Sequence, residues 1–258
     1  MKIVITGASS GIGAALARAY AAPGHTLALT GRDETRLAAV ADACRKSGAE
    51  VEMVALDVTD RAALANWLEA SDTRQPIDLL IANAGISAGT GEAGETVAQA
   101  EKIFAVNLTG LLNTLHPVIP RMQQRGRGQI ALMASLAGLR GLPTAPAYSA
   151  SKGAVRLYGE GLREALAPFG ISVSVICPGF IRTPMTAVNK FPMPFLMEVN
   201  EAARRIKSGL TRKNARIAFP WPLYAVVWLL ASLPVSWGDC LLRRLPGKAA
   251  DDSNKMQR

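Results

Sequence analysis

A short apolar run at residues 2–6 leads directly into a glycine-rich turn that contains Gly7, Gly11 and Gly13. Small and apolar residues at 14–22 then predict a helix. A strand, a glycine turn and a helix in this order let the backbone turn tightly and approach a pyrophosphate at the helix N-terminus. The spacing Gly-x-x-x-Gly-x-Gly differs from the commoner Gly-x-Gly-x-x-Gly, so a glycine turn without a ligand is the alternative.

The same glycine turn also fits Gly-x-Ser-x-Gly, the nucleophile turn of serine hydrolases, with Ser9 as the nucleophile. Such a hydrolase needs an acid and then a histidine later in the chain. The last histidine is His116, and more than half of the chain follows it. The order of residues therefore disfavours a hydrolase.

Apolar runs alternate with helical patterns along the chain up to residue 183. Strands are predicted at residues 2–6, 25–30, 51–56, 77–82, 129–134 and 171–176, and helices at 14–22, 34–46, 147–166 and through Phe104 towards Met122. This alternation predicts a Rossmann-like, doubly wound parallel α/β sheet. Ligands of such sheets bind at the carboxyl ends of the strands, where Gly7, Gly31, Asp57, Asn83, Ser135 and Gly179 fall.

The end of the second predicted strand bears on the choice of cofactor. An NAD-binding protein would place an acidic residue there for the ribose 2′-hydroxyl, whereas this chain has Gly31 followed by Arg32. An arginine can hold a 2′-phosphate through charge-assisted hydrogen bonds, which favours NADP. Asp57 and Val58 follow the third strand and are expected beside the adenine.

Tyr148 and Lys152 lie four residues apart in the predicted helix 147–166, so their side chains are one turn apart on one face. An ammonium beside a phenol favours the phenolate, which predicts a tyrosine pKa below about 10 and a usable general acid or base. A half-buried ring beside a solvated lysine is the ordinary alternative for an isolated pair of this kind.

Six motifs stand in a characteristic order: Thr6-Gly-Ala-Ser-Ser-Gly-Ile-Gly13, Asn83-Ala84-Gly85, Asn107, Ser135, Tyr148-x-x-x-Lys152 and Pro178-Gly-x-x-x-Thr183. Together they resemble the short-chain dehydrogenase/reductase family over residues 2–183. Ala82 departs from the pattern, because the family often has a second asparagine before Asn83. The asparagine that the family uses to steady the central strand is present as Asn83.

The resemblance implies a role for each polar motif residue. Tyr148 would exchange a proton with a carbonyl or alcohol oxygen, and Lys152 would lower the pKa of Tyr148 and bind the nicotinamide ribose. Ser135 would hydrogen-bond the substrate oxygen, and Asn107 would hold a water that links Lys152 to solvent. The expected cofactor set is Gly7, Ser9, Ser10, Gly11, Ile12, Gly13, Arg32, Asp57, Val58, Asn83, Ala84, Gly85, Tyr148, Lys152, Ile181 and Thr183, the last two holding the nicotinamide carboxamide.

The resemblance therefore implies an NADP(H)-dependent oxidoreductase that acts on a carbonyl compound or a secondary alcohol. A non-catalytic NADP-binding scaffold or redox sensor of the same fold is the alternative. The presence of Asn107, Ser135, Tyr148 and Lys152 together favours the enzyme.

Composition narrows the remaining classes. Two histidines (His25 and His116) and three scattered cysteines (Cys44, Cys177 and Cys240) leave little material for a metal site, and the odd cysteine count favours a reducing cytoplasm. We read no signal peptide at the start of the chain. The net charge is +2 over residues 1–188 and +7 over 189–258, so the basicity is local and does not indicate nucleic-acid binding.

Residues 184–197 are rich in Met, Phe and Pro and lie where a substrate lid is expected. A lid of this composition favours an apolar or acyl-type substrate, while simple coverage of the core is the alternative. An amphipathic helix with Arg204, Arg205 and Lys207 is predicted at 198–210.

Residues 217–238 carry no charge, and three prolines limit the longest helical stretch to 223–233. Eleven residues are too few to span a bilayer, which takes about 20. Flanking cations fit a segment on an anionic membrane surface, and burial against the domain or a second subunit fits the same pattern.

We expect one domain, with a catalytic core at 1–188, a lid and apolar C-terminal segment at 189–248 and a disordered tail at 249–258, in a homo-oligomer.

Overall fold

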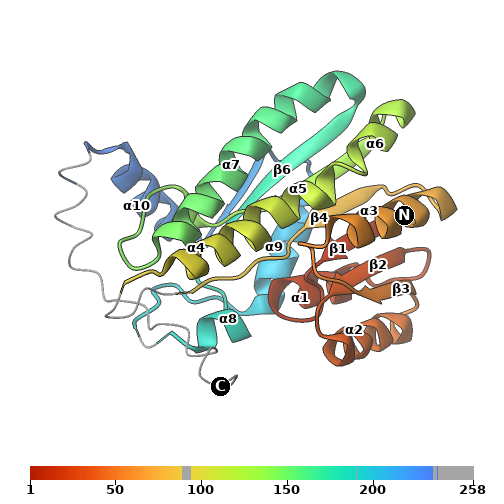
Figure 1. Cartoon of the computed structure of the whole chain (residues 1–258), viewed down its shortest axis with the longest axis horizontal. Helices are drawn as coiled ribbons and strands as arrows, with labels where there is room; N and C mark the ends of the chain where they lie inside the picture. The colour runs from red at the N-terminus through yellow and green to blue at the C-terminus, as the bar shows by residue number, and fades with distance from the viewer. Residues whose placement is uncertain (89–93, 190, 235–236, 238–258) are drawn as a thin grey trace.

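The computed structural model describes the chain except residues 89–93, 190, 235–236 and 238–258 (Figure 1). Its core is a sheet of seven parallel strands in the order β3-β2-β1-β4-β5-β6-β7. The strands are β1 Lys2–Thr6, β2 Thr26–Gly31, β3 Glu50–Ala55, β4 Leu79–Ala82, β5 Gly128–Met133, β6 Ile171–Pro178 and β7 Arg216–Phe219. The predicted doubly wound parallel sheet is therefore confirmed.

Helices cover both faces of the sheet, which explains why β1, β2 and β4 are buried along their whole length. On one face pack α1 Gly11–Tyr20, α2 Glu34–Lys46 and α9 Val199–Thr211. On the other face pack α3 Arg61–Arg74, α5 Gly110–Leu115, α6 Ile119–Arg125 and α7 Pro146–Leu166 (Figure 1). The two apolar layers flank a sheet that has no solvent-facing side at its centre.

The predicted strands and helices are found within a few residues of their expected ends, and helix 34–46 has the expected bounds. Helix α3 and strand β7 were not predicted. Strand β7 has only four residues, and the three that follow Arg216 open a longer uncharged stretch. Neither the length nor the polarity of these three residues therefore distinguishes the strand from the residues after it.

The helix expected through Phe104 towards Met122 is interrupted. It runs as α4 Val97–Phe104, a π-helical segment Ala105–Thr109 and α5, and it stops at Leu115 before α6 begins. Pro117 ends it, because a proline lacks the amide proton that would continue the helix. Within the described residues, the run 97–125 is also long and apolar enough to cross a membrane, but half of its most apolar window is buried in the protein.

The C-terminal quarter contains α8 Pro184–Ala187, α9 and α10 Trp221–Ser232. The predicted amphipathic helix is confirmed as α9. Residues 217–238 divide into two parts, because Ile217 and Phe219 of β7 are buried in the core whereas α10 has no buried residue. The tail expected at 249–258 lies outside the described residues.

Two glycines of α7 allow a test of how tightly this helix packs on the sheet. A Cβ on Gly159 would lie 2.6 Å from Val175 Cγ2 of β6, whereas a Cβ on Gly161 would meet no atom within 4 Å. Both substitutions to alanine gain about 1 kcal/mol of helix propensity, but Gly159→Ala also overpacks the core at about 1–3 kcal/mol. Urea unfolding should show Gly161→Ala stabilised and Gly159→Ala destabilised relative to the unmodified protein. Equal stability of the two variants would contradict this packing.

Candidate active site

A cleft of about 250 Å³ lies along the carboxyl ends of the strands. Among the residues that line it are sixteen of the predicted ones: Gly7, Ser9, Ser10, Gly11, Ile12, Arg32, Asp57, Val58, Asn83, Ala84, Gly85, Ser135, Tyr148, Lys152, Ile181 and Thr183. Gly13 and Asn107 were also predicted but lie behind this lining. The structure thus brings together residues from the whole length of the core.

The glycine turn is shaped by close contacts with the loop after β4. Gly7 and Gly11 have φ angles of +67° and +54°, a backbone conformation that would be strained for a residue with a side chain. A Cβ on Gly7 would lie 2.8 Å from Ala84 Cα, and one on Gly13 would lie 2.2 Å from the Gly7 carbonyl oxygen. Gly13 therefore lets α1 pack against the turn, while Gly7 and Gly11 lie at the cleft itself.

The N-terminus of α1 is open to an anion. Ser10 precedes the helix but makes no side-chain capping hydrogen bond, and the first turn contains no acidic residue. The first backbone N–H groups of a helix have no partner within the helix, and they carry the positive end of its dipole. Since Ser10, Gly11 and Ile12 line the cleft, this end of α1 fits the pyrophosphate of a dinucleotide.

Two arginines lie near the end of β2. Arg32 is more than half exposed, and its Nη1 lies 3.9 Å from Asp57 Oδ2. Asp33 caps α2 by accepting from the backbone N–H of Arg36, and its Oδ2 accepts from Arg36 Nε. Both Asp33 and Arg36 line the cleft but were not predicted, because sequence spacing alone does not show that the first turn of α2 reaches it.

Tyr148, Lys152 and Ser135 meet at the inner end of the cleft. Lys152 is buried, its Nζ donates to the Met133 carbonyl oxygen at 2.8 Å, and it lies 6.0 Å from the centre of the Tyr148 ring. Burial raises the pKa of Tyr148, and a hydrogen bond with Ser135 lowers it by less. Burial also lowers the pKa of Lys152 to about 8. The predicted pKa below about 10 for Tyr148 is therefore wrong for this structure, because desolvation of the phenol raises its pKa by more than the Ser135 hydrogen bond lowers it.

Asn107 lies in the π-helical segment and is buried. Its Oδ1 accepts from the backbone N–H of Ile86 at 2.8 Å, and its Nδ2 donates to the Ile86 carbonyl oxygen and to Ser151 Oγ. Single π turns are frequent at functional sites. Here the turn directs a carboxamide that holds the loop after β4 in place, next to Lys152.

Asn83, at the start of the loop after β4, also holds this loop in place. Its Nδ2 donates to the carbonyl oxygens of Thr6 and Gly7, and its own backbone N–H donates to Thr6 Oγ1. The ends of β1 and β4 are tied together by these bonds. These bonds do not need a second asparagine, so the alanine at position 82 does not weaken the connection.

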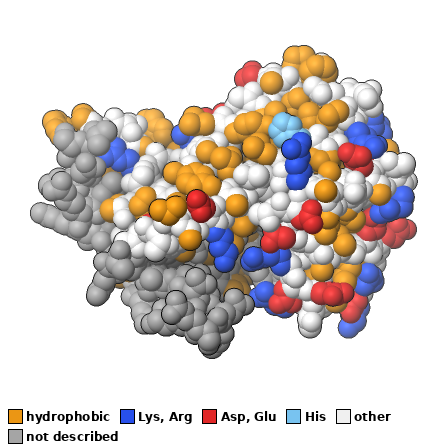
Figure 2. Space-filling view, in the orientation of Figure 1, with side chains coloured by type: hydrophobic (Ala, Val, Ile, Leu, Met, Phe, Trp, Pro, Cys, Tyr) orange, Lys and Arg blue, Asp and Glu red, His pale blue; other side chains and the backbone are white. Residues whose placement is uncertain are grey.

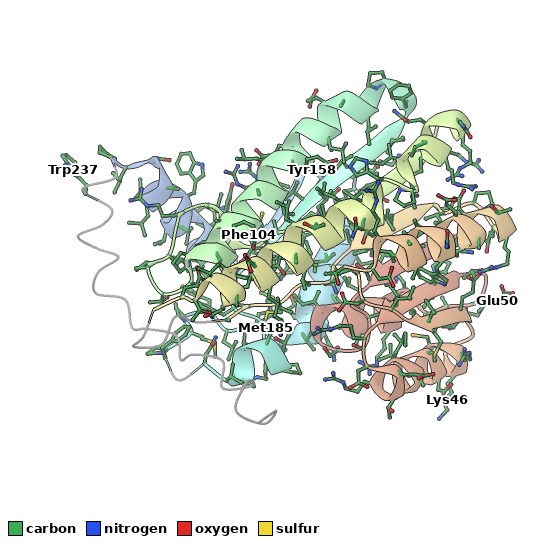
Figure 3. The ribbon with its side chains drawn as sticks, viewed as in Figure 1. Lys46, Glu50, Phe104, Tyr158, Met185 and Trp237 are labelled. Carbon is green, nitrogen blue, oxygen red and sulfur yellow. The ribbon has the colours of Figure 1, made fainter. Side chains whose placement is uncertain are left out.

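A second cavity, of about 400 Å³, adjoins the cleft and shares Ser135 and Tyr148 with it. Its walls are mostly apolar and include Phe180, Phe191, Pro192, Pro194, Leu223, Val226, Val227 and Leu230. Rings of Phe180 and Phe191 pack edge to face with centroids 6.0 Å apart. The segment expected to be a lid therefore covers an apolar chamber, and its wall is completed by α10, which was not predicted to belong to the site. Met185 of α8, labelled in Figure 3, lines both cavities.

Comparison with known proteins places this geometry among nucleotide-dependent enzymes. A family model described as short chain dehydrogenase matches residues 1–191. An uncharacterized oxidoreductase of Myxococcus xanthus (strain DK1622) is 39% identical, over 94% of this chain and 96% of its own. The ketoacyl reductase HetN of Nostoc sp. is 33% identical, over 83% and 77%. A short-chain dehydrogenase from Sphingobium yanoikuyae, solved in complex with NADPH, is 32% identical with a TM-score of 0.80, over 97% and 98%.

The buried Lys152 predicts a pH dependence of stability. Its pKa is about 8 in the folded protein and 10.5 for a fully solvated lysine, so the unfolded chain binds more protons between these values. The free energy of unfolding should therefore rise with pH between about 8 and 10.5. We expect the unmodified protein to gain about 1–3 kcal/mol relative to Lys152→Met between pH 7 and pH 10, measured by urea unfolding. A difference between the two proteins that does not change with pH would contradict the lowered pKa.

Proposed function

The chain belongs to the short-chain dehydrogenase/reductase family and is an oxidoreductase, and on that premise we propose that it interconverts apolar carbonyl compounds and secondary alcohols with NADP(H). One observation carries the proposal. The apolar 400 Å³ cavity opens onto the hydroxyl-bearing side chains of Ser135 and Tyr148, at the inner end of the nucleotide cleft. A ligand in this cavity can present an oxygen to both hydroxyls.

In the proposed reduction, the substrate carbonyl oxygen accepts hydrogen bonds from Ser135 and Tyr148. Because burial raises the pKa of Tyr148, the phenol holds its proton at neutral pH and can donate it as charge develops on that oxygen. Ser135 stabilises the same charge. Bound NADPH supplies the hydride, which is the cofactor's own chemistry.

Lys152 and Asn107 support this centre from behind. The Lys152 ammonium, held by the Met133 carbonyl oxygen, lies in the cleft where it can bind the ribose next to the nicotinamide and return a proton to Tyr148. Asn107 holds Ile86 and so positions the loop beside Lys152. Ile181 and Thr183 also line the cleft and would hold the carboxamide.

The choice of NADP over NAD is supported by Arg32. Its exposed guanidinium lies at the end of β2 beside Asp57, where it can reach a 2′-phosphate. The Asp33 carboxylate is already engaged by Arg36. The NADPH complex of the Sphingobium yanoikuyae protein supports the same choice.

The substrate class and the cellular setting belong to the same proposal. The apolar chamber supports an apolar or acyl-type substrate, as does the similarity to the ketoacyl reductase HetN. We propose a cytoplasmic homo-oligomer with peripheral membrane contact through the part of residues 217–238 that forms α10, since Ile217 and Phe219 are buried. The exposed Leu157 on α7 supports the contact between subunits, and the exposed apolar residues of α10 support the contact with a membrane.

Tyr148→Phe tests the catalytic proposal. We expect NADPH-dependent reduction of a ketone panel to fall about 10²–10⁴-fold, because the variant cannot donate the proton, while NADPH binding measured by fluorescence changes little. Tyr158→Phe is the matched control on the same helix, since Tyr158 hydrogen-bonds His116 outside the site. Retention of most activity in Tyr148→Phe would refute the proposed acid.

Arg32→Asp tests the cofactor proposal. The substituted carboxylate would repel a 2′-phosphate, so the ratio of kcat/KM for NADPH to that for NADH should fall about 10–100-fold. Arg45→Asp, a change of the same charge on the exposed side of α2, should leave this ratio unchanged. Equal kcat/KM for both cofactors in the unmodified protein would show that Arg32 does not select NADP.

A further inference from the structure

Helix α10 has two different apolar faces. Leu223, Val226, Val227 and Leu230, spaced as one helical stripe, line the apolar cavity next to Tyr148. Trp221, Trp228 and Leu229 lie on the opposite side and are 71%, 53% and 57% exposed, and Val226, at the edge of the cavity stripe, is 54% exposed. The helix therefore separates the substrate cavity from the exterior by a single layer of apolar side chains.

Such a helix is unusual at the surface of a protein. A surface helix normally turns a polar face outward, and a helix that is apolar all round is normally buried. No residue of α10 is charged, and none is buried. In Figure 2 charged side chains gather over the half of the molecule around α2 and α3, and Figure 3 shows Trp237 projecting at the opposite end, beyond α10.

The first turn of α10 is anchored to the sheet and to α7. Arg216 of β7 donates to Tyr224 Oη at 3.2 Å and forms an ion pair with Glu160 of α7. Glu160 also accepts from Arg156 one turn away. This anchor fixes the cavity face of α10 towards Tyr148, so the face that bears Trp228 points outward.

We propose, on the basis of the proposed function, that the outward face of α10 lies in the headgroup layer of an anionic membrane, and that the substrate is a long-chain carbonyl compound drawn from that membrane. The carbonyl would reach Ser135 and Tyr148, and the apolar chain would lie along Leu223 and Val227. The substrate then passes from lipid to the cavity beside α10 without crossing water.

Three observations favour a membrane over a second copy of the chain. Helix α10 has twelve residues, and only those on one side can meet a partner, whereas a stable interface takes about 20–30 residues from each partner. Tryptophan has an apolar body with a polar N–H and suits the membrane interface. By sequence, residues 189–258 carry a net charge of +7, and a basic segment favours anionic over neutral lipid.

The test compares two substrates and two kinds of vesicle. The full chain with NADPH is mixed with vesicles of phosphatidylcholine, with or without phosphatidylserine, and sedimentation is measured at low and high salt. Turnover is followed with cyclohexanone in water and with a long-chain methyl ketone dissolved in the vesicles. We expect sedimentation with the anionic vesicles only, partial release by salt, and several-fold faster turnover of the long-chain ketone on those vesicles.

The double variant Trp228→Ser, Leu229→Ser should lose several-fold in both vesicle binding and long-chain turnover and should reduce cyclohexanone at the unmodified rate. Phe169→Ser, which removes an exposed aromatic residue outside α10, should change none of these. Three results would each overturn the inference. The protein would not sediment with vesicles at low salt, the rate of long-chain ketone turnover would be the same with and without anionic vesicles, or the double variant would dissociate an oligomer. Failure to reduce any ketone, with vesicle binding intact, would instead overturn the proposed function.

Discussion

The site depends on the close approach of the loops that follow β1 and β4. Gly7 has no side chain, so the Ala84 backbone can approach it, and Asn83 Nδ2 then bonds the carbonyl oxygens of Thr6 and Gly7. These two strands are neighbours at the centre of the sheet, where ligands of doubly wound folds bind. The same contact aims the N-terminus of α1 into the cleft and places Gly85 beside Lys152 and Asn107.

Burial at the inner end of the cleft lowers the stability of the fold through Lys152 but favours proton transfer between Lys152, Tyr148 and a ligand. Desolvation lowers the pKa of Lys152 and raises that of Tyr148, so both groups are held nearer their neutral forms than in water. A buried lysine costs stability at neutral pH, and only the Met133 carbonyl oxygen is seen to accept from it in the described residues. Such a cost is typical of sites in which a proton must move without solvent.

The sequence predicted most of the nucleotide cleft, because its residues follow strands whose apolar runs are long and whose carboxyl ends meet at one edge. Gly11, Arg32 and Ser135 are examples. It could not predict Arg36 at the cleft, which depends on how α2 begins, or the π turn at Asn107, which depends on packing. The pKa of Tyr148 was misjudged because spacing shows which groups are neighbours but not how deeply they are buried. The wall formed by α10 was also missed. An uncharged segment can pack against the domain, a second subunit or a membrane, and the sequence does not show which of these it contacts.

The weak attachment of α10 has a consequence for how the site would work at a membrane. A helix of twelve residues is marginal on its own, and this one packs the partly buried Leu223 and Tyr224 of its first turn against the core. Its order depends on the Arg216 and Tyr224 anchor and on whatever contacts its two faces. A chain in the cavity contacts one face, and lipid would contact the other. Since each contact reduces the conformational freedom that the other must overcome, substrate binding and membrane binding at α10 should reinforce each other.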